Sequence, residues 1–178
     1  MPTRINRADF LPPAEQPYAQ EDRALPIGFG QTNSQPTVVA FMLKLLEPKP
    51  GDRILDLGCG SGWTTALLAE CVGPKGQVIG LELVPQLVEF GRHNLNPYKF
   101  KNAEIRQAQA GVLGLPQEPV FDKILVSAAG NKLPRELLPQ FTQRLVLPIK
   151  NSIWVFDKQP DGNLSEHEYP GFAFVPLL

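Results

Sequence analysis

Apolar and polar positions along the chain alternate between segments of strand type and segments of helix type. Apolar runs of strand length occur at Arg53–Leu57, Gln77–Leu81, Ala103–Gln107, Phe121–Val126 and Arg144–Ile149. Apolar residues at helical spacing occur at Val38–Leu46, Trp63–Val72, Val84–Leu95 and Arg135–Phe141. This alternation predicts βαβ units, and therefore a parallel sheet with helices on both faces.

The two ends of the chain depart from this alternation. Residues 1–35 are rich in Pro, Gly, Asn and Gln, which predicts an irregular arm with short helical pieces. Ser152–Phe156 and Phe172–Leu177 are strand-like, and the turn signal Pro160-Asp-Gly162 lies between them. We therefore predict one α/β domain over residues 1–178, with a Rossmann-like, doubly wound, mostly parallel sheet and antiparallel C-terminal strands. Its parts are an arm and loop (1–36), a ligand-binding βαβ core (37–150) and a β ribbon (151–178).

Charge and composition exclude several classes of protein. Among 178 residues, 17 Lys and Arg balance 18 Asp and Glu, giving a net charge of -1. This balance argues against nucleic-acid binding and against a polybasic membrane anchor. No apolar run approaches the roughly 18 residues of a membrane span, and the N-terminus shows no signal pattern. Two cysteines and two histidines at unrelated positions predict a cytoplasmic protein with no disulfide framework and no metal site.

The strongest chemical signal is the segment Asp56-Leu-Gly-Cys-Gly-Ser-Gly62, which follows an apolar strand and opens a helix. Its glycines allow a sharp turn with positive φ and a close approach of a ligand to the backbone. Glu82 ends the next strand, 24 residues after Gly58, where a carboxylate can accept ribose hydroxyls. Together they predict a nucleoside-bearing cofactor at the carboxyl edge of the sheet, the alternative being a tight turn without a ligand.

The acid-x-Gly-x-Gly-x-Gly pattern resembles motif I of the class I S-adenosylmethionine-dependent methyltransferases. The dinucleotide pattern Gly-x-Gly-x-x-Gly is not matched, because Trp63 occupies the place of its third glycine. The resemblance implies S-adenosylmethionine as cofactor and S-adenosylhomocysteine as product. It implies donor contacts at Asp56, Gly58, Cys59, Gly60, Gly62, Glu82 and Leu83. The alternatives are a polar anchor for Asp56, a small filler for Cys59 and a core position for Leu83.

The segment Ala24-Leu-Pro-Ile-Gly-Phe-Gly-Gln-Thr-Asn-Ser-Gln-Pro36, called the signature loop below, resembles that of the protein-L-isoaspartate O-methyltransferases. Further similarities run from Arg7-Ala-Asp-Phe-Leu-Pro12 through Phe121–Ala129 to Phe174-Val-Pro-Leu177. This resemblance implies that Ser34 is the active-site residue and that Gln31 and Thr32 lie at the donor. On sequence chemistry alone, Ser34 is an N-cap of the helix that follows.

The family resemblance implies methyl transfer to the α-carboxylate of L-isoaspartyl residues in damaged proteins, a protein-repair activity whose partners are isoaspartyl peptides. Such a reaction requires alignment and exclusion of water rather than an activated nucleophile, which agrees with the shortage of His and Cys. Two alternatives stay open. The chain is a degenerate relative that binds S-adenosylmethionine without this activity, or it methylates a different carboxylate or a small molecule.

The sequence also departs from the family pattern. Ala108-Gln109-Ala110 replaces the usual Gly-Asp-Gly, and the resemblance implies that the uncharged Gln109 takes the place of the acid that addresses the adenine amino group, which predicts weaker donor binding. Asn33 replaces an apolar residue beside Ser34, and Thr142-Gln143 replaces a Gly-Gly turn. The chain begins almost at the segment Arg7-Ala-Asp-Phe10, which predicts a compact form without the usual N-terminal helices, with a substrate groove that is more open or is completed by a partner.

Overall fold

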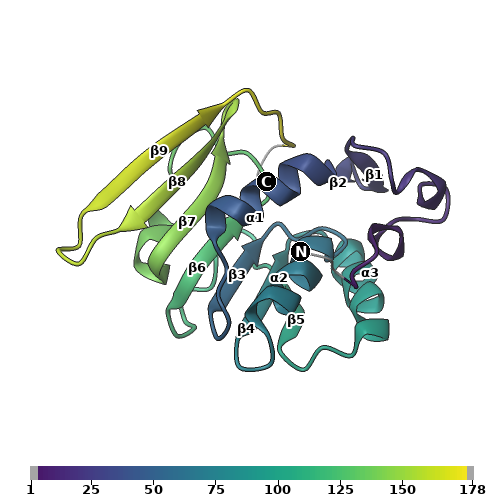
Figure 1. Cartoon of the computed structure of the whole chain (residues 1–178), viewed down its shortest axis with the longest axis horizontal. Helices are drawn as coiled ribbons and strands as arrows, with labels where there is room; N and C mark the ends of the chain where they lie inside the picture. Colours follow the sequence, from purple (N-terminus) through teal and green to yellow (C-terminus); the bar gives the residue numbers. More distant parts are fainter. Residues whose placement is uncertain (1–3, 176–178) are drawn as a thin grey trace.

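The computed structural model describes residues 4–175, which form one seven-stranded sheet with helices packed against it (Figure 1). The sheet strands are β3 (Arg53–Leu57), β4 (Gln77–Glu82), β5 (Ala103–Gln107), β6 (Phe121–Val126), β7 (Phe141–Ile149), β8 (Ser152–Lys158) and β9 (Leu164–Pro170). Their spatial order is β5-β4-β3-β6-β7-β8-β9, with parallel pairing from β5 to β7 and antiparallel pairing of β8 and β9. The predicted fold class is confirmed.

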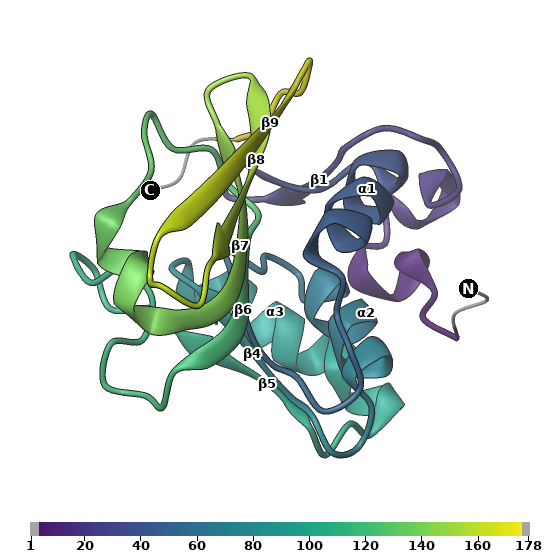
Figure 2. The ribbon, with the colours of Figure 1, turned by 60° about the vertical axis from the view of Figure 1, so that its left-hand side comes forward.

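The two faces of the sheet are covered differently, as Figure 2 shows. One face carries the α-helices α1 (Pro36–Leu46), α2 (Trp63–Val72) and α3 (Pro85–Leu95). The other carries the 3-10 helix η4 (Arg135–Gln140) and loops that contribute Leu113 and Leu115. The helix predicted at Arg135–Phe141 is therefore a 3-10 segment, because Pro139 inside it has no backbone N–H to donate.

The N-terminal arm contains the expected short helical pieces and one unexpected hairpin. The pieces are the 3-10 helices η1 (Arg7–Phe10) and η2 (Gln16–Tyr18), and a third, η3 (Asn96–Tyr98), follows α3. The signature loop folds as the hairpin β1 (Leu25–Gly28) and β2 (Gln31–Asn33), with φ of +92°, +56° and +73° at Gly28, Phe29 and Gly30. Leu25 and Ile27 of the hairpin pack against Leu11 and Leu87, which fixes the exit toward Ser34.

The C-terminal ribbon differs from its prediction. Its second strand is β9, not Phe172–Leu177, and Pro176 and Leu177 lie outside the described residues. The segment after β9 turns toward α1, because the ring of Phe172 stacks on Phe41 with centroids 5.5 Å apart. The carbonyl of Val175 then accepts from the Ala129 N–H, 2.8 Å away. The end of the described chain thus lies against the connection that follows β6.

The sheet topology creates one crevice at the carboxyl ends of the parallel strands. β3 pairs with β4 on one side and β6 on the other, so the chain order reverses beside β3. Ligands of open α/β sheets bind at such switch points. Along β3, Ile54 packs toward α1 and α2 while Leu55 and Leu57 pack on the opposite face.

Among residues 4–175, no helix is long and apolar enough to cross a bilayer.

Candidate functional site

A cavity of about 440 Å³ opens at this switch point. It is walled by the segments that follow β3, β4, β5 and β6 and by the hairpin strand β2 with Ser34. The volume falls in the range of about 300–1,000 Å³ that small ligands occupy. Most of the predicted site residues line it, namely Gln31, Thr32, Ser34, Gly58, Cys59, Gly60, Glu82, Leu83 and Gln109. The remaining two, Asp56 and Gly62, lie behind its wall.

The glycine turn after β3 uses its amides within the protein. Gly58 and Cys59 donate to the Leu81 carbonyl at 2.8 and 3.2 Å, and Gly62 donates to the Cys59 carbonyl at 2.9 Å. Gly62, at φ +88°, has no room for a side chain, since a Cβ would lie 2.8 Å from Ile105 Cδ1. These three amides are thus not free to bind a phosphate, which favours a nucleoside ligand without a pyrophosphate.

Glu82 connects the end of β4 to the glycine turn. Its Oε2 accepts from the Gly60 N–H at 2.9 Å, and its Oε1 accepts from the N–H groups of Leu83 and Val84 at 2.7 and 2.9 Å. The side chain lines the cavity although the residue is only 7% exposed. Each carboxylate oxygen offers about two acceptor positions, so Oε2 keeps one for a hydroxyl in the cavity.

Asp56 lies behind the cavity wall and is fully buried. Its Oδ2 accepts from the hydroxyls of Thr64 and Thr65, each at 2.7 Å, while Oδ1 has no partner among the described residues. Burial raises the pKa of Asp56 to about 6, and the two threonine hydrogen bonds oppose that rise. The anchoring contact that the sequence offered as an alternative is therefore present, and it holds the first turn of α2.

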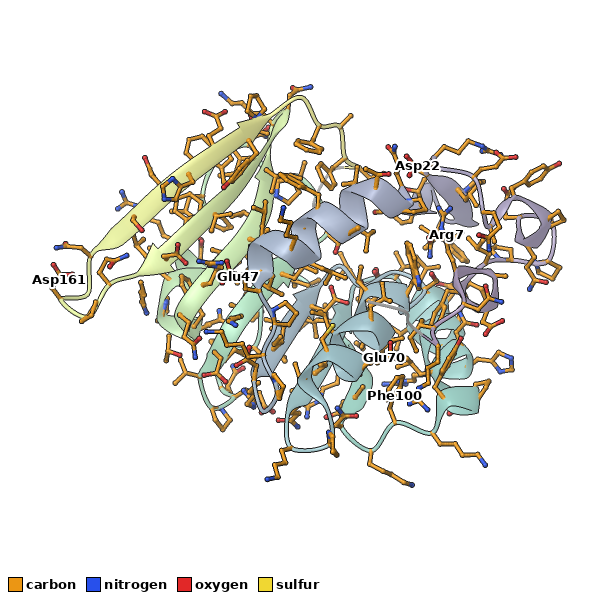
Figure 3. All side chains as sticks on the ribbon, in the orientation of Figure 1. Arg7, Asp22, Glu47, Glu70, Phe100 and Asp161 are labelled. Atoms are coloured by element: carbon orange, nitrogen blue, oxygen red, sulfur yellow. The ribbon has the colours of Figure 1, made fainter. Side chains whose placement is uncertain are left out.

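Ser34 does not cap α1, so that expectation is wrong. The N-cap residue is Gln35, whose side chain makes no capping bond. The carboxylate of Asp22, labelled in Figure 3, takes this role by accepting from the Thr37 N–H at 2.9 Å and the Thr37 hydroxyl at 2.7 Å. These bonds lower the pKa of Asp22. Within residues 4–175, the hydroxyl of Ser34 makes no hydrogen bond and is available to a ligand.

A second cavity of about 260 Å³ adjoins the first, and the two are called the outer and the inner cavity below. The two cavities share Thr32, Ser34, Ser127 and Val175 as a common wall. The outer cavity is otherwise lined mainly by apolar groups of α1 and the C-terminal segment, including Val38 and Phe174. The free hydroxyl of Ser34 therefore lies where a ligand in the inner cavity would meet one in the outer cavity.

Sequence reasoning missed several residues of this site. Ser127 and Ala128 line the cavity because they follow β6, and the rule that ligands bind at carboxyl ends of strands could have found them. Ser61 and Trp63 also line it. Arg7 does not line the cavity but hydrogen-bonds to residues that do. No local sequence pattern indicates this role, because its partners are distant from it in sequence.

The site lacks the ligands of a metal centre within the described chain, where no three His, Cys, Asp or Glu residues gather. The mostly parallel sheet with a cavity at its switch point, the occupied amides of Gly58, Cys59 and Gly62, and the strand-end glutamate are features of a Rossmann-like fold of the methyltransferase type.

Comparisons with known proteins narrow this class. The family model "Protein-L-isoaspartate(D-aspartate) O-methyltransferase (PCMT)" matches residues 2–178. A protein-L-isoaspartate O-methyltransferase of Aeropyrum pernix is 41% identical over 181 residues, covering 98% of this chain and 70% of the relative. One of Methanopyrus kandleri is 37% identical, with coverages of 98% and 80%.

A solved structure agrees with these relatives. A Plasmodium falciparum protein assigned as a protein-L-isoaspartate O-methyltransferase, in complex with S-adenosyl-L-homocysteine, superposes with a TM-score of 0.86 at 26% identity. The match covers 98% of this chain and 86% of that one. The chain belongs to the protein-L-isoaspartate O-methyltransferase family.

Proposed function

We infer that the protein transfers a methyl group from S-adenosylmethionine to the α-carboxylate of L-isoaspartyl residues in damaged proteins. The observation that carries this function is the position of Ser34, whose free hydroxyl stands between two adjoining cavities. An enzyme of this kind needs one cavity for the donor and another for the acceptor, with their reacting atoms meeting at the boundary. Family membership supplies the identity of both substrates.

The inner cavity fits the donor in shape and charge. Glu82 would hold the ribose through the acceptor position left on Oε2, and the walls at Leu83 and Val112 offer apolar contact to the base. The carboxylate of Asp56 lies behind the same wall and places further negative charge near a cationic ligand. When bound, the donor supplies an electrophilic methyl on a sulfonium, so that the C–O bond forms as the C–S bond breaks.

The protein's own contribution to the reaction is alignment. An acceptor carboxylate is already ionised at neutral pH, so no general base is needed to activate it. We propose that the Ser34 hydroxyl donates a hydrogen bond to this carboxylate and directs one oxygen toward the inner cavity. Gln31, Thr32 and the glycine turn at Gly58–Gly62 shape the donor side, and Gln109 faces the base. A donor and an acceptor that fill the two adjoining cavities would together exclude water from the methyl group.

Methyl transfer to an isoaspartyl peptide tests the function directly. Labelled S-adenosylmethionine is incubated with a peptide that contains L-isoaspartate, and the same peptide with L-aspartate serves as control. We expect base-labile incorporation only into the isoaspartyl peptide. Binding of S-adenosylhomocysteine without turnover would favour the donor-binding alternative, and turnover of the aspartyl peptide or of another carboxylate would favour a different acceptor.

Ser34→Ala tests the role of the hydroxyl. We expect kcat/KM for the isoaspartyl peptide to fall about 10- to 150-fold, because a hydrogen bond to a charged group contributes about 1.5–3 kcal/mol. The affinity for S-adenosylhomocysteine should stay unchanged. Ser165→Ala on β9, far from both cavities, is the matched control. Full activity in Ser34→Ala would contradict the proposed acceptor geometry.

We further propose that residues 1–178 act as one domain, since the seven-stranded sheet and the hairpin of β1 and β2 wall the same cavity. A cytoplasmic location is supported by the free state of both Cys59 and Cys71, which is typical of proteins in a reducing compartment. Nucleic acids are not proposed as substrates, because the net charge of -1 offers no electrostatic attraction to phosphates. Fractionation of the source cells tests the location.

A further inference from the structure

Asn33 joins the two halves of the site through buried hydrogen bonds. Its Oδ1 accepts from Arg7 Nε at 2.8 Å, and its Nδ2 donates to Ser61 Oγ at 3.2 Å. All three residues are buried: Asn33 is 4% exposed, Arg7 is 5% exposed and Ser61 is 2% exposed. Asn33 belongs to β2, immediately before Ser34, whereas Ser61 belongs to the glycine turn, so this bridge links acceptor and donor segments.

The orientation of the Asn33 amide is set by its partners. Arginine donates hydrogen bonds and accepts none, so the oxygen of the Asn33 amide must face Arg7. The amide nitrogen therefore faces Ser61, whose hydroxyl can accept. An apolar side chain at this position would satisfy neither partner, and both are buried away from water.

Arg7 fixes the signature loop on the other side of the bridge. Its Nη2 donates to the carbonyls of Asn33 at 3.2 Å and of Ser34 at 3.0 Å. The same guanidinium also donates to three carbonyls of the preceding arm, those of Ala19, Glu21 and Arg23. Figure 3 labels Arg7 beside the hairpin. One buried cation thus holds the backbone on both sides of the hairpin.

Ser61 is held from the opposite direction as well. The Asn94 side chain of α3 donates from Nδ2 to the Ser61 carbonyl at 3.0 Å. Both Asn33 and Ser61 line the inner cavity, so a ligand there contacts the bridge at both ends. A ligand that orders the glycine turn would therefore act on Ser61, which is hydrogen-bonded to the residue that precedes Ser34.

We propose that Asn33 is a positioning residue that couples donor binding to the order of the signature loop at Ser34. Donor in the inner cavity fixes the glycine turn, and the bridge fixes Ser34 for the acceptor carboxylate. By linkage, the coupling is reciprocal, so loss of the bridge should also weaken donor binding. The proposal rests on the proposed function only for the identity of the acceptor.

Hydrogen exchange with and without S-adenosylhomocysteine tests the coupling independently of turnover. In the wild type, we expect the ligand to slow exchange about fivefold or more in both segments, 19–34 and 58–62. In Asn33→Leu, we expect protection only in 58–62, together with an S-adenosylhomocysteine affinity lowered about fivefold. Equal protection of 19–34 in the variant and the wild type would overturn the proposal.

Three further variants separate coupling from stability. Asn33→Asp should restore protection of 19–34, because a carboxylate accepts from Arg7 and from the Ser61 hydroxyl. Ser61→Ala removes the acceptor of the Asn33 amide with less disturbance of the core. We expect it to lose protection of 19–34 as Asn33→Leu does, so the proposal can be tested even if Asn33→Leu fails to fold. Asn102→Leu is the matched control, because Asn102 also donates partly buried hydrogen bonds, to the carbonyls of Ala69 and Gly73, but lies outside both cavity walls. Equal loss of protection in Asn102→Leu would reduce Asn33 to a structural role.

The outcome also distinguishes this coupling from the proposed function. A wild type that binds S-adenosylhomocysteine but does not methylate isoaspartyl peptides would refute the function, while the exchange data would still decide on the bridge. A wild type that binds no S-adenosylhomocysteine would overturn both. In an active wild type, the peptide KM should fall as donor saturation rises, and this dependence should vanish in Asn33→Leu.

Discussion

The carboxylate of Glu82 is the group on which donor binding should depend most, and Glu82→Gln changes it with little change of shape. In the wild type, Oε2 accepts from Gly60 and Oε1 accepts from Leu83 and Val84. A glutamine keeps one acceptor oxygen and turns an NH2 group toward the other amide site. Two donors then face each other at one end of the side chain, and the negative charge is lost.

The two consequences of Glu82→Gln have separable magnitudes. In the free protein, a partly buried backbone N–H such as that of Gly60 loses its acceptor, which lowers the free energy of unfolding by about 1–3 kcal/mol. In the complex, a ribose hydroxyl loses a charged acceptor, which is worth about 1.5–3 kcal/mol and raises the Kd about 10- to 150-fold.

Calorimetric titration with S-adenosylhomocysteine measures the second effect, and urea unfolding measures the first. Glu104→Gln on β5 is the matched control, because Glu104 is exposed and pairs with Arg106 at the surface. That control should change either quantity by at most about 1 kcal/mol. If Glu82→Gln folds normally and keeps its affinity within the range of the control, Glu82 shapes the turn and does not hold the ribose.

Three other substitutions test charge and burial. The folded pKa of Asp56, about 6, exceeds the ordinary 3.8, so its contribution to stability is complete below pH 3.8 and is lost as pH rises through about 6. The free energy of unfolding of the wild type minus that of Asp56→Asn, measured by urea titration, should fall as pH rises over that interval. A difference that does not change with pH would refute the raised pKa of Asp56. Gln109→Asp should tighten S-adenosylhomocysteine binding about 10-fold by providing a charged acceptor, whereas unchanged calorimetric affinity would place the base elsewhere. Lys123→Met leaves buried Asp52 without its ion pair, 2.7 Å long, and should lower the free energy of unfolding by about 3–5 kcal/mol. A loss below about 1 kcal/mol in urea unfolding would show that Asp52 finds another partner.

The central strands could be predicted because burial on both faces leaves a nearly continuous apolar run. β3 and β6 have the predicted bounds, Arg53–Leu57 and Phe121–Val126. β9 could not be predicted, since its residues are mostly exposed and it is held by backbone pairing with β8. Conversely, Phe172–Val175 is apolar without being a strand, because Phe172 packs on a helix.

The donor side of the candidate site was predictable for a similar reason. Gly58, Gly60 and Glu82 lie at the ends of successive strands, and the parallel topology brings such ends to one edge. The hairpin before Ser34 could not be predicted, because its tip depends on positive φ at Gly28, Phe29 and Gly30 and periodicity gives no signal for it.

Buried polar side chains in the described chain concentrate around the inner cavity. Those that line it or belong to its hydrogen-bond network are Arg7, Asn33, Asp56, Ser61, Thr64, Thr65, Glu82 and Asn94. Burial of such groups is unfavourable unless they are hydrogen-bonded, and each of these side chains makes at least one hydrogen bond, although Oδ1 of Asp56 makes none. Methyl transfer to an ionised carboxylate requires alignment rather than proton transfer. A hydrogen-bonded polar frame around two adjoining cavities meets that requirement, and neither a histidine nor a cluster of metal ligands stands among the described residues that line it.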